Sequence, residues 1–405
     1  MNQINNIWAL PTATRYLSDI RKELAVGVSL CIVMTDPDAP YAFQKALKYG
    51  LEMDEGLTTF SLDLASLEGV TLSSIQKAVV GEAQSVSLND FIKNEAPDVI
   101  LLHGFEDVTL TMRKDIIAFT RRWAEHCHTN GDMKSLCLLV PGSHMDDIRD
   151  IRSFTTSSRI NIRCLVGVPS ALDIQLLSRT HFVGEFSSAE AYWRELIISS
   201  LSGNDLGLAD LLGQSSLDTY DNINNVLQDY ASLNSWNRTD MEKKLQKWVP
   251  LAVSINPDVP KHAENIKLMW MKIIVYTLEY GEEIHPAVLA LLGRDEEIKR
   301  RIWRAQMTLV LPIIDELRIK MYLLLKDKLS NTWGHEDIPE IGEIKYSLEK
   351  LSIHSREWKQ YYETVRYARE VRNKLAHMDV ITLHDYAYIW NSWQRIRQSG
   401  KLHVS

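Results

Sequence analysis

The run "VSLCIVMT" at residues 28–35 decides the fold of the first half of the chain. It is short and almost wholly apolar, as in a strand that is covered on both faces of a parallel sheet. Four similar runs follow, and stretches of helical spacing such as 41–50, 110–127 and 188–201 separate the runs. This alternation predicts an α/β domain with a parallel sheet over residues 1–205. The further strand runs are 57–64, 97–104, 135–142 and 160–168.

The second half of the sequence carries a different pattern. After about residue 205 the strand signal disappears, and helical spacing recurs at 217–233, 238–249, 263–279, 286–329, 343–351, 356–377 and 383–398. We therefore expect a helical connector over 206–285 and an all-α helical bundle over 286–405. Pro312 should kink or split the helix predicted over 286–329. Clusters of turn-forming residues at 202–207 and 254–262 mark the expected hinges.

Composition is that of an ordinary globular protein. The chain has 405 residues, of which 45% are hydrophobic and 24% charged, a size that fits two or three domains. No apolar run approaches the ~18 residues of a membrane span, and the first residues lack a signal-peptide pattern. We expect a cytoplasmic protein that has no membrane partner. The four cysteines are scattered without a Cys-x-x-Cys pair and predict neither disulfides nor a structural zinc: Cys31, Cys127, Cys137 and Cys164.

Charge is distributed unevenly along the chain. The net charge of -8 argues against a protein devoted to coating nucleic acid. From residue 286 onward, however, 20 Lys and Arg face 16 Asp and Glu, a local +4 that leaves -12 for residues 1–285. A polyanionic partner would therefore meet the C-terminal part. The alternative is an ordinary difference between two solvated surfaces.

The loop after the first predicted strand lacks the means to bind phosphate. A phosphate-binding loop needs glycines, so that backbone N–H groups can approach the ligand, and a lysine. The sequence here is "DPDAPYAF" (36–43), with two aspartates instead. The order of strands and helices over residues 10–210, including "PDVILLHGFED" (97–107), resembles the core of the AAA and STAND classes of P-loop NTPases without the catalytic loop. The resemblance implies a domain that keeps the fold for sensing or assembly and needs no cofactor. A doubly wound sheet without any ligand is the alternative.

The segment "EVRNKLAHMD" (370–379) places a cation and an imidazole near the end of a predicted helix. Trp358, Val365 and Arg372 are seven residues apart, which predicts Arg372 on the apolar face, where a guanidinium needs a buried acceptor or an anion. A capping box "TLHD" (382–385) opens another helix, so the first should end near His377. Similar Arg-to-His spacing occurs in "RRWAEHCH" (121–128), which reads as a solvated helix face, and from Arg397 to His403 in the terminal tail.

In this context "RNKLAH" (372–377) resembles the signature of the HEPN superfamily of helical domains: Arg, four to six residues, then His, with a polar residue after the Arg. The long helical stretch "WRAQMTLVLPIIDELRIKMYLLLKDKL" (303–329) resembles the first helices of that domain, and the likeness spans residues 286–400. It implies a homodimer, formed through the C-terminal helical domain, that cleaves RNA without metal. His377 would serve as acid or base, Arg372 would hold the scissile phosphate, and Asn373 would orient the pair.

The residues themselves fit this chemistry, because RNA supplies its own 2′-OH nucleophile and needs only proton transfer and charge stabilisation. No metal-ligand pattern lies near His377. An alternative is a non-catalytic scaffold or sensor, in which Arg372 pairs with Glu316 or Glu370 and His377 caps a helix end. The combination of domains resembles STAND-like antiphage or abortive-infection proteins, with a protein partner or phage trigger sensed by the N-terminal domain. CRISPR-associated ribonucleases activated by cyclic oligoadenylate rank second, because some 25 residues precede the first strand here.

Overall fold

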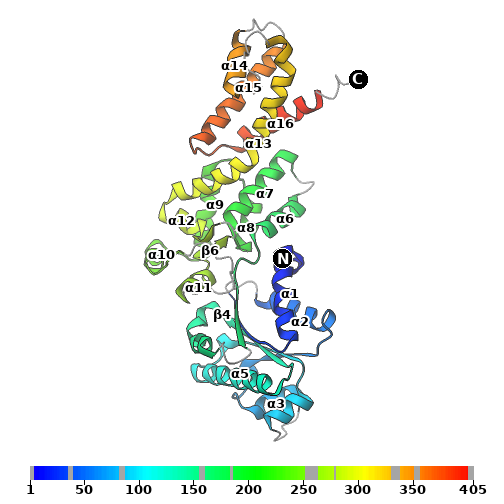
Figure 1. The fold of residues 1–405 in the computed structure, drawn as a ribbon. Coiled ribbons are helices and arrows are strands. Elements are labelled where there is room, and N and C mark those ends of the chain that lie inside the picture. The colour runs from blue at the N-terminus through cyan, green and yellow to red at the C-terminus, as the bar shows by residue number, and fades with distance from the viewer. Residues whose placement is uncertain are drawn as a thin grey trace. The chain divides into compact units, whose positions relative to one another are not determined.

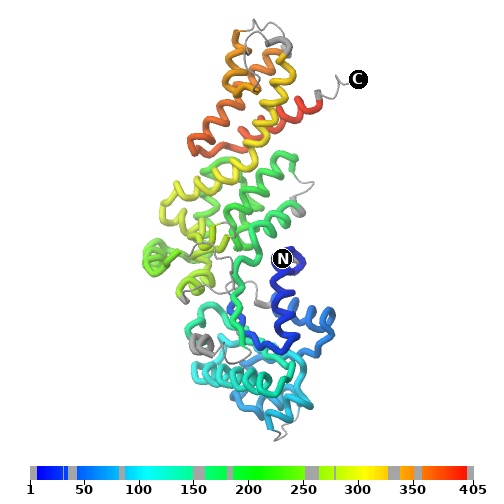
Figure 2. Tube along the Cα trace, in the orientation of Figure 1, coloured from blue at the N-terminus to red at the C-terminus, as the bar shows by residue number. Residues whose placement is uncertain are grey.

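The computed structural model describes residues 4–34, 40–81, 87–154, 160–182, 186–250, 263–277, 280–329, 338–350 and 356–399. The chain forms two compact units (Figure 1). Unit 1 comprises residues 1–173, 203–205 and 239–285, and unit 2 comprises 174–202, 206–238 and 286–405. The backbone trace therefore passes repeatedly from one unit to the other (Figure 2).

Unit 1 is built on a five-stranded parallel sheet in the order β2-β3-β4-β1-β5. Each strand lies within one of the five predicted runs, so the predicted parallel α/β sheet is confirmed. Every residue of β4 is buried, because the strand lies inside the sheet between β3 and β1 and helices such as α1 and α5 pack on it. The strands are β1 (Ser29–Met34), β2 (Thr59–Asp63), β3 (Val99–His103), β4 (Ser135–Pro141) and β5 (Ile160–Leu165).

Helices connect the strands, and their ends follow local sequence rules. α1 (Pro11–Ala25) starts with a proline in its first turn and buries one stripe of residues four or three apart. The Thr109 hydroxyl caps α5 (Leu110–Asn130), and Gly131 ends it with a φ of 72°. The other helices between strands are α2 (Pro40–Met53), α3 (Leu72–Val80) and α4 (Leu88–Asp90); short helical turns are η1 (Ile4–Ala9), η2 (Leu64–Ser66), η3 (Phe91–Glu95), η4 (Phe105–Asp107) and η5 (Gly142–Phe154).

A hairpin in unit 1 corrects the prediction that no strand follows residue 205. β6 (Ile274–Thr277) and β7 (Gly281–Ile284) pair antiparallel, after α10 (Arg238–Leu245) and α11 (Ala263–Trp270). Polar groups lie beneath the hairpin: Asp205 accepts from Lys272 at 3.4 Å and lies 3.3 Å from His285 Nε2. The hairpin was missed because each strand is only four residues long and lies in a stretch of helical spacing.

Unit 2 is entirely helical over its described residues. α13 packs against α7, α15 and α16, and the stacked rings of Trp193 in α7 and Tyr386 in α16 lie 5.7 Å apart. α13 continues through Pro312, so of the two outcomes expected there the split does not occur, and the kink stays a prediction; a break lies at Gly293, between α12 and α13. The helices are α6 (Ala171–Phe182, which begins in unit 1), α7 (Ser188–Ser202), α8 (Leu206–Gly213), α9 (Tyr220–Leu233), α12 (Pro286–Leu292), α13 (Asp295–Leu329), α14 (Ile341–Lys350), α15 (Arg356–Ala376) and α16 (Leu383–Ser399).

The expected domains 1–205, 206–285 and 286–405 stay a prediction. The two compact units of the structure divide the chain differently. Residues 206–238 belong to the helical unit, whereas 239–285 belong with the sheet. The boundary at 285 coincides with the end of the sheet-containing unit. The hinge expected at 202–207 contains short segments of both units. The hinge expected at 254–262 lies outside the described residues. Every helix in the described residues is too short or too polar to span a bilayer.

Candidate functional site

α15 carries the predicted site residues Arg372 and Asn373 in its last turns, and His377 follows its end. Its buried stripe consists of Val365, Ala368, Val371 and Leu375, each at most 1% exposed. Arg372 follows Val371 and is rotated ~100° away from it, and its side chain is 47% exposed. The prediction that Arg372 lies on the apolar face is therefore wrong, because the buried stripe follows spacings of three, three and four and passes through Val371 instead of Arg372.

His377 is the first residue beyond α15, and it is exposed. The Asp379 N–H donates to the Lys374 carbonyl at 2.9 Å and the Met378 N–H to the Leu375 carbonyl at 3.1 Å, the two bonds of a Schellman motif. Met378 has a φ of 62°, in the left-handed region where glycine is usual. The expected helix end near His377 is confirmed, and the imidazole is carried on the turn instead of the helix.

Arg372 has a weak ion-pair partner. Its Nη2 lies 3.5 Å from Glu340 Oε2, and the Glu340 side chain is 65% exposed. Such an exposed pair contributes at most ~1 kcal/mol. Of the partners expected in the scaffold interpretation, Glu370 pairs with Arg366 at 3.1 Å, and no ion pair links Glu316 to Arg372 within the described ranges. The guanidinium is thus available to an anion that displaces one carboxylate.

Lys374, in the middle of the motif, is tied into the scaffold. Its Nζ lies 3.1 Å from Asp385 Oδ2, and the Tyr367 hydroxyl donates to Asp385 Oδ1 at 2.6 Å. Thr382 and Asp385 form the predicted capping box at the start of α16, with reciprocal bonds of 3.1 Å. Burial opposes the charge of Asp385, but the bonds from Tyr367, Thr382 and Lys374 outweigh it and lower the pKa of this carboxyl. Burial and the neighbouring Asp385 raise the pKa of Tyr367.

Asn373 is partly exposed, and its backbone carbonyl accepts from the His377 N–H at 3.0 Å. It therefore joins the helix to the turn that carries the imidazole. Its expected role in orienting Arg372 and His377 remains a prediction, as do the catalytic roles of those two residues.

Sequence reasoning missed Trp303 and Gln306, which lie on α13 and contact the turn. Trp303 Nε1 donates to the Leu375 carbonyl at 2.6 Å, and Gln306 exchanges two hydrogen bonds with the backbone of Ile381. More than 70 residues separate these partners along the chain. No local pattern could have identified them, because a buried glutamine within a helical stripe gives no sign of its distant partner.

In unit 1, α11 packs against the position where doubly wound sheets usually bind ligands. Ligands bind at the carboxyl ends of the strands where the connections diverge, which here is between β1 and β4. α11 covers this point: a Cβ on Gly142, directly after β4, would lie 2.9 Å from Trp270 Cβ and 3.0 Å from the Met34 carbonyl. Lys267 of α11 pairs with Asp146 of η5. α11 therefore packs directly against the carboxyl end of β4.

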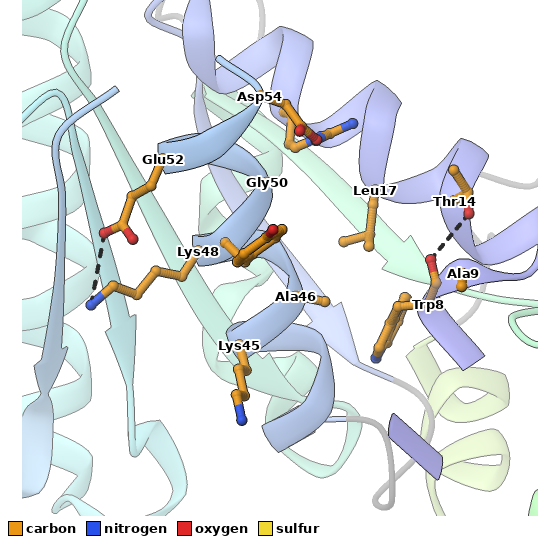
Figure 3. Close-up of a pocket in the computed structure, with 12 residues that line it drawn as sticks. Trp8, Ala9, Thr14, Leu17, Lys45, Ala46, Lys48, Gly50, Glu52 and Asp54 are labelled. Atoms are coloured by element: carbon orange, nitrogen blue, oxygen red, sulfur yellow. Dashed lines mark hydrogen bonds and ion pairs between the residues drawn. The ribbon is translucent and has the colours of Figure 1, made fainter. Parts of the chain in front are cut away.

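A cavity of ~710 Å³ lies instead between α1 and α2 (Figure 3). Lys45 and Ala46 of α2 line it opposite Leu17 of α1 and Trp8. Two ion pairs stand at its edge: Arg21 with Asp54, and Lys48 with Glu52 at 3.8 Å. The lining is mainly apolar, and most of its charges are compensated, so it shows no arrangement of acid, base and nucleophile.

No known protein family and no curated protein matches the sequence. Among solved structures, the chain is similar to one in "Structure of Drosophila ORC bound to poly(dA/dT) DNA and Cdc6", with a TM-score of 0.31 and 13% identity over 98% of this chain and 71% of the other. It is also similar to the S. cerevisiae Hsp104–ADP complex, with a TM-score of 0.31 and 12% identity over 90% of this chain and 56% of the other. Likenesses at this score establish no relationship in function.

Proposed function

We propose that this protein is a regulated, metal-independent endoribonuclease that acts at a dimeric site made of Arg372, Asn373 and His377. The observation that carries the proposal is an exposed guanidinium and an exposed imidazole at the end of one helix. Within the described residues, the guanidinium pairs only with a solvent-exposed carboxylate at 3.5 Å. Neither side chain is buried in the core of the helical unit. The HEPN-like spacing of the two residues supports the same interpretation.

The reaction would be a transesterification of RNA. The ribose 2′-OH attacks the adjacent phosphorus, the P–O5′ bond breaks, and the products are a 2′,3′-cyclic phosphate and a 5′-OH. His377 of one chain would remove the 2′ proton, and His377 of a second copy would protonate the leaving 5′ oxygen. Arg372 would stabilise the additional negative charge on the phosphorane, a task suited to a planar guanidinium with several donors.

The test is cleavage of RNA by the purified full chain in EDTA. We expect His377→Ala to lower the rate by ~10²–10⁴ and Arg372→Ala by ~10²–10³. The matched control is Arg122→Ala with His128→Ala, since these exposed residues of α5 have a similar Arg-to-His spacing. The control pair should cleave as wild type does. Equal activity in His377→Ala and wild type, or loss only in the control, would refute the proposal.

A second candidate is a non-catalytic scaffold, which the ion pair between Arg372 and Glu340 favours. In that case Glu340→Gln would change the thermal stability of the protein or its binding to a partner, and neither wild type nor the variant would cleave RNA. In a ribonuclease, Glu340→Gln would instead free Arg372 and raise the affinity for RNA. RNA binding by wild type and Glu340→Gln, measured at two salt concentrations, separates the two candidates.

For unit 1 we propose a sensing role in an antiphage or abortive-infection system, acting through a protein or phage trigger. The close packing of α11 on Gly142, at the carboxyl end of β4, supports a trigger other than a nucleotide held at the strand ends. Calorimetry with cyclic oligoadenylates should therefore show no heat of binding. Binding of such a ligand would favour the CRISPR-associated alternative.

A further inference from the structure

The turn that carries His377 is fastened to α13 on both sides of the imidazole. Before it, Trp303 Nε1 donates to the Leu375 carbonyl at 2.6 Å. After it, Gln306 Nε2 donates to the Ile381 carbonyl at 2.9 Å, and the Ile381 N–H donates to Gln306 Oε1 at 3.0 Å. Trp303 and Gln306 are three residues apart and thus lie on one face of α13.

Gln306 is fully buried, with 0% of its surface exposed, and so is almost all of Ile381, at 2%. The side-chain amide of Gln306 forms hydrogen bonds with both the buried N–H and the buried carbonyl of Ile381. Buried backbone groups that lose their partners are strongly disfavoured, so any other conformation of this turn would be penalised at two groups. The left-handed Met378, with a φ of 62°, shows that the turn adopts a backbone conformation that its own sequence does not favour.

We infer that Trp303 and Gln306 are positioning residues that hold the His377 turn in one conformation, and that they set the rate of RNA cleavage through that imidazole. The second part rests on the proposed ribonuclease function. Arg372 lies on the regular part of α15, one turn before the fastened segment, and does not depend on the latch formed by Trp303 and Gln306. Loss of the latch should therefore slow proton transfer, which needs an imidazole within hydrogen-bond reach, and leave phosphate binding unchanged.

Two substitutions each remove one side of the latch. Trp303→Phe deletes the indole N–H and keeps an aromatic ring in place. Gln306→Met keeps the length of the side chain and deletes both hydrogen bonds. Trp393→Phe is the matched control: Trp393 lies on α16 of the same unit, and among the described residues its Nε1 has no hydrogen-bond partner.

The experiment measures amide hydrogen exchange at Met378, Asp379 and Ile381 together with kcat and KM for RNA cleavage in EDTA, using the full chain. We expect both latch variants to raise exchange of these amides about tenfold, the factor that corresponds to ~1.4 kcal/mol. The same variants should lower kcat about tenfold with KM within about twofold of wild type. Trp393→Phe should match wild type in every measurement. If Gln306→Met fails to fold, Trp303→Phe decides the question.

The outcomes are distinguishable. Unchanged amide exchange in Trp303→Phe would overturn the latch itself. Faster exchange with wild-type kcat would overturn the positioning role and leave the proposed ribonuclease function standing. Faster exchange in a protein whose wild type does not cleave RNA would overturn the proposed function, and the catalytic part of the inference with it, while the latch remains as a structural device.

Discussion

Replacing Met378 by glycine should stabilise the helical unit. Met378 adopts a φ of 62° at the position of the Schellman motif that glycine usually occupies. A side chain in the left-handed region costs ~1–2 kcal/mol, which Met378→Gly removes. Glycine also lowers the free energy of unfolding by ~0.4–1 kcal/mol, because it raises the conformational entropy of the unfolded chain. The Met378 side chain is 64% exposed, so little apolar burial is lost, and the expected net gain is ~0.5–1 kcal/mol.

The assay is calorimetric unfolding of the full chain. For a unit of this size, the expected gain raises the Tm of its transition by ~1–4 °C. Met378→Ala is the matched control, because it shortens the same exposed side chain and keeps the strained backbone; its Tm should lie close to that of wild type. If glycine and alanine shift the Tm by the same amount, or if glycine lowers it, the reasoning about backbone strain is refuted.

Two further substitutions test the packing at α11 and the capping box. Gly142→Ala should cost ~1–3 kcal/mol, because the added methyl would lie 2.9 Å from Trp270 Cβ, whereas Gly69→Ala, with no atom within 4 Å, should not lower stability; urea unfolding compares them. Asp385→Ala should cost ~1–3 kcal/mol at pH 7. Because the pKa of Asp385 is lower in the folded state than its ordinary 3.8, its contribution is complete above about pH 4 and is lost as the pH falls through the folded value. The difference between the urea midpoints of wild type and Asp385→Ala should therefore shrink as the pH falls below 3.8, and a constant difference from pH 7 to 2 would contradict this.

Local patterns in the sequence were sufficient where an element could be recognised without its neighbours. The five apolar runs became the five parallel strands because a strand buried on both faces must be apolar along its whole length. The "TLHD" capping box formed as predicted, since its bonds join residues only three apart. The prediction that no strand follows residue 205 failed because the pattern of two four-residue strands is ambiguous, and of the two outcomes expected at Pro312 the split did not occur.

The candidate site shows the same division. Its residues could be selected from the sequence, because Arg372 and His377 are a cation and a titratable imidazole near a helix end. Their surroundings could not: a period of seven placed Arg372 on the buried face, whereas packing of α15 buries the row through Val371 and Leu375. Which side of a helix faces the core depends on the helices that pack against it.

Taken alone, the amino-acid sequence determined the parallel sheet, the helices after residue 286 and the end of α15 near His377. Tertiary structure alone decided that α11 packs against the carboxyl end of β4, that Arg372 faces solvent beside Glu340, and that Gln306 hydrogen-bonds Ile381, 75 residues away. The physical reason is range: hydrophobic periodicity and capping act within a few residues, whereas burial and hydrogen bonding between distant segments exist only after the chain has folded.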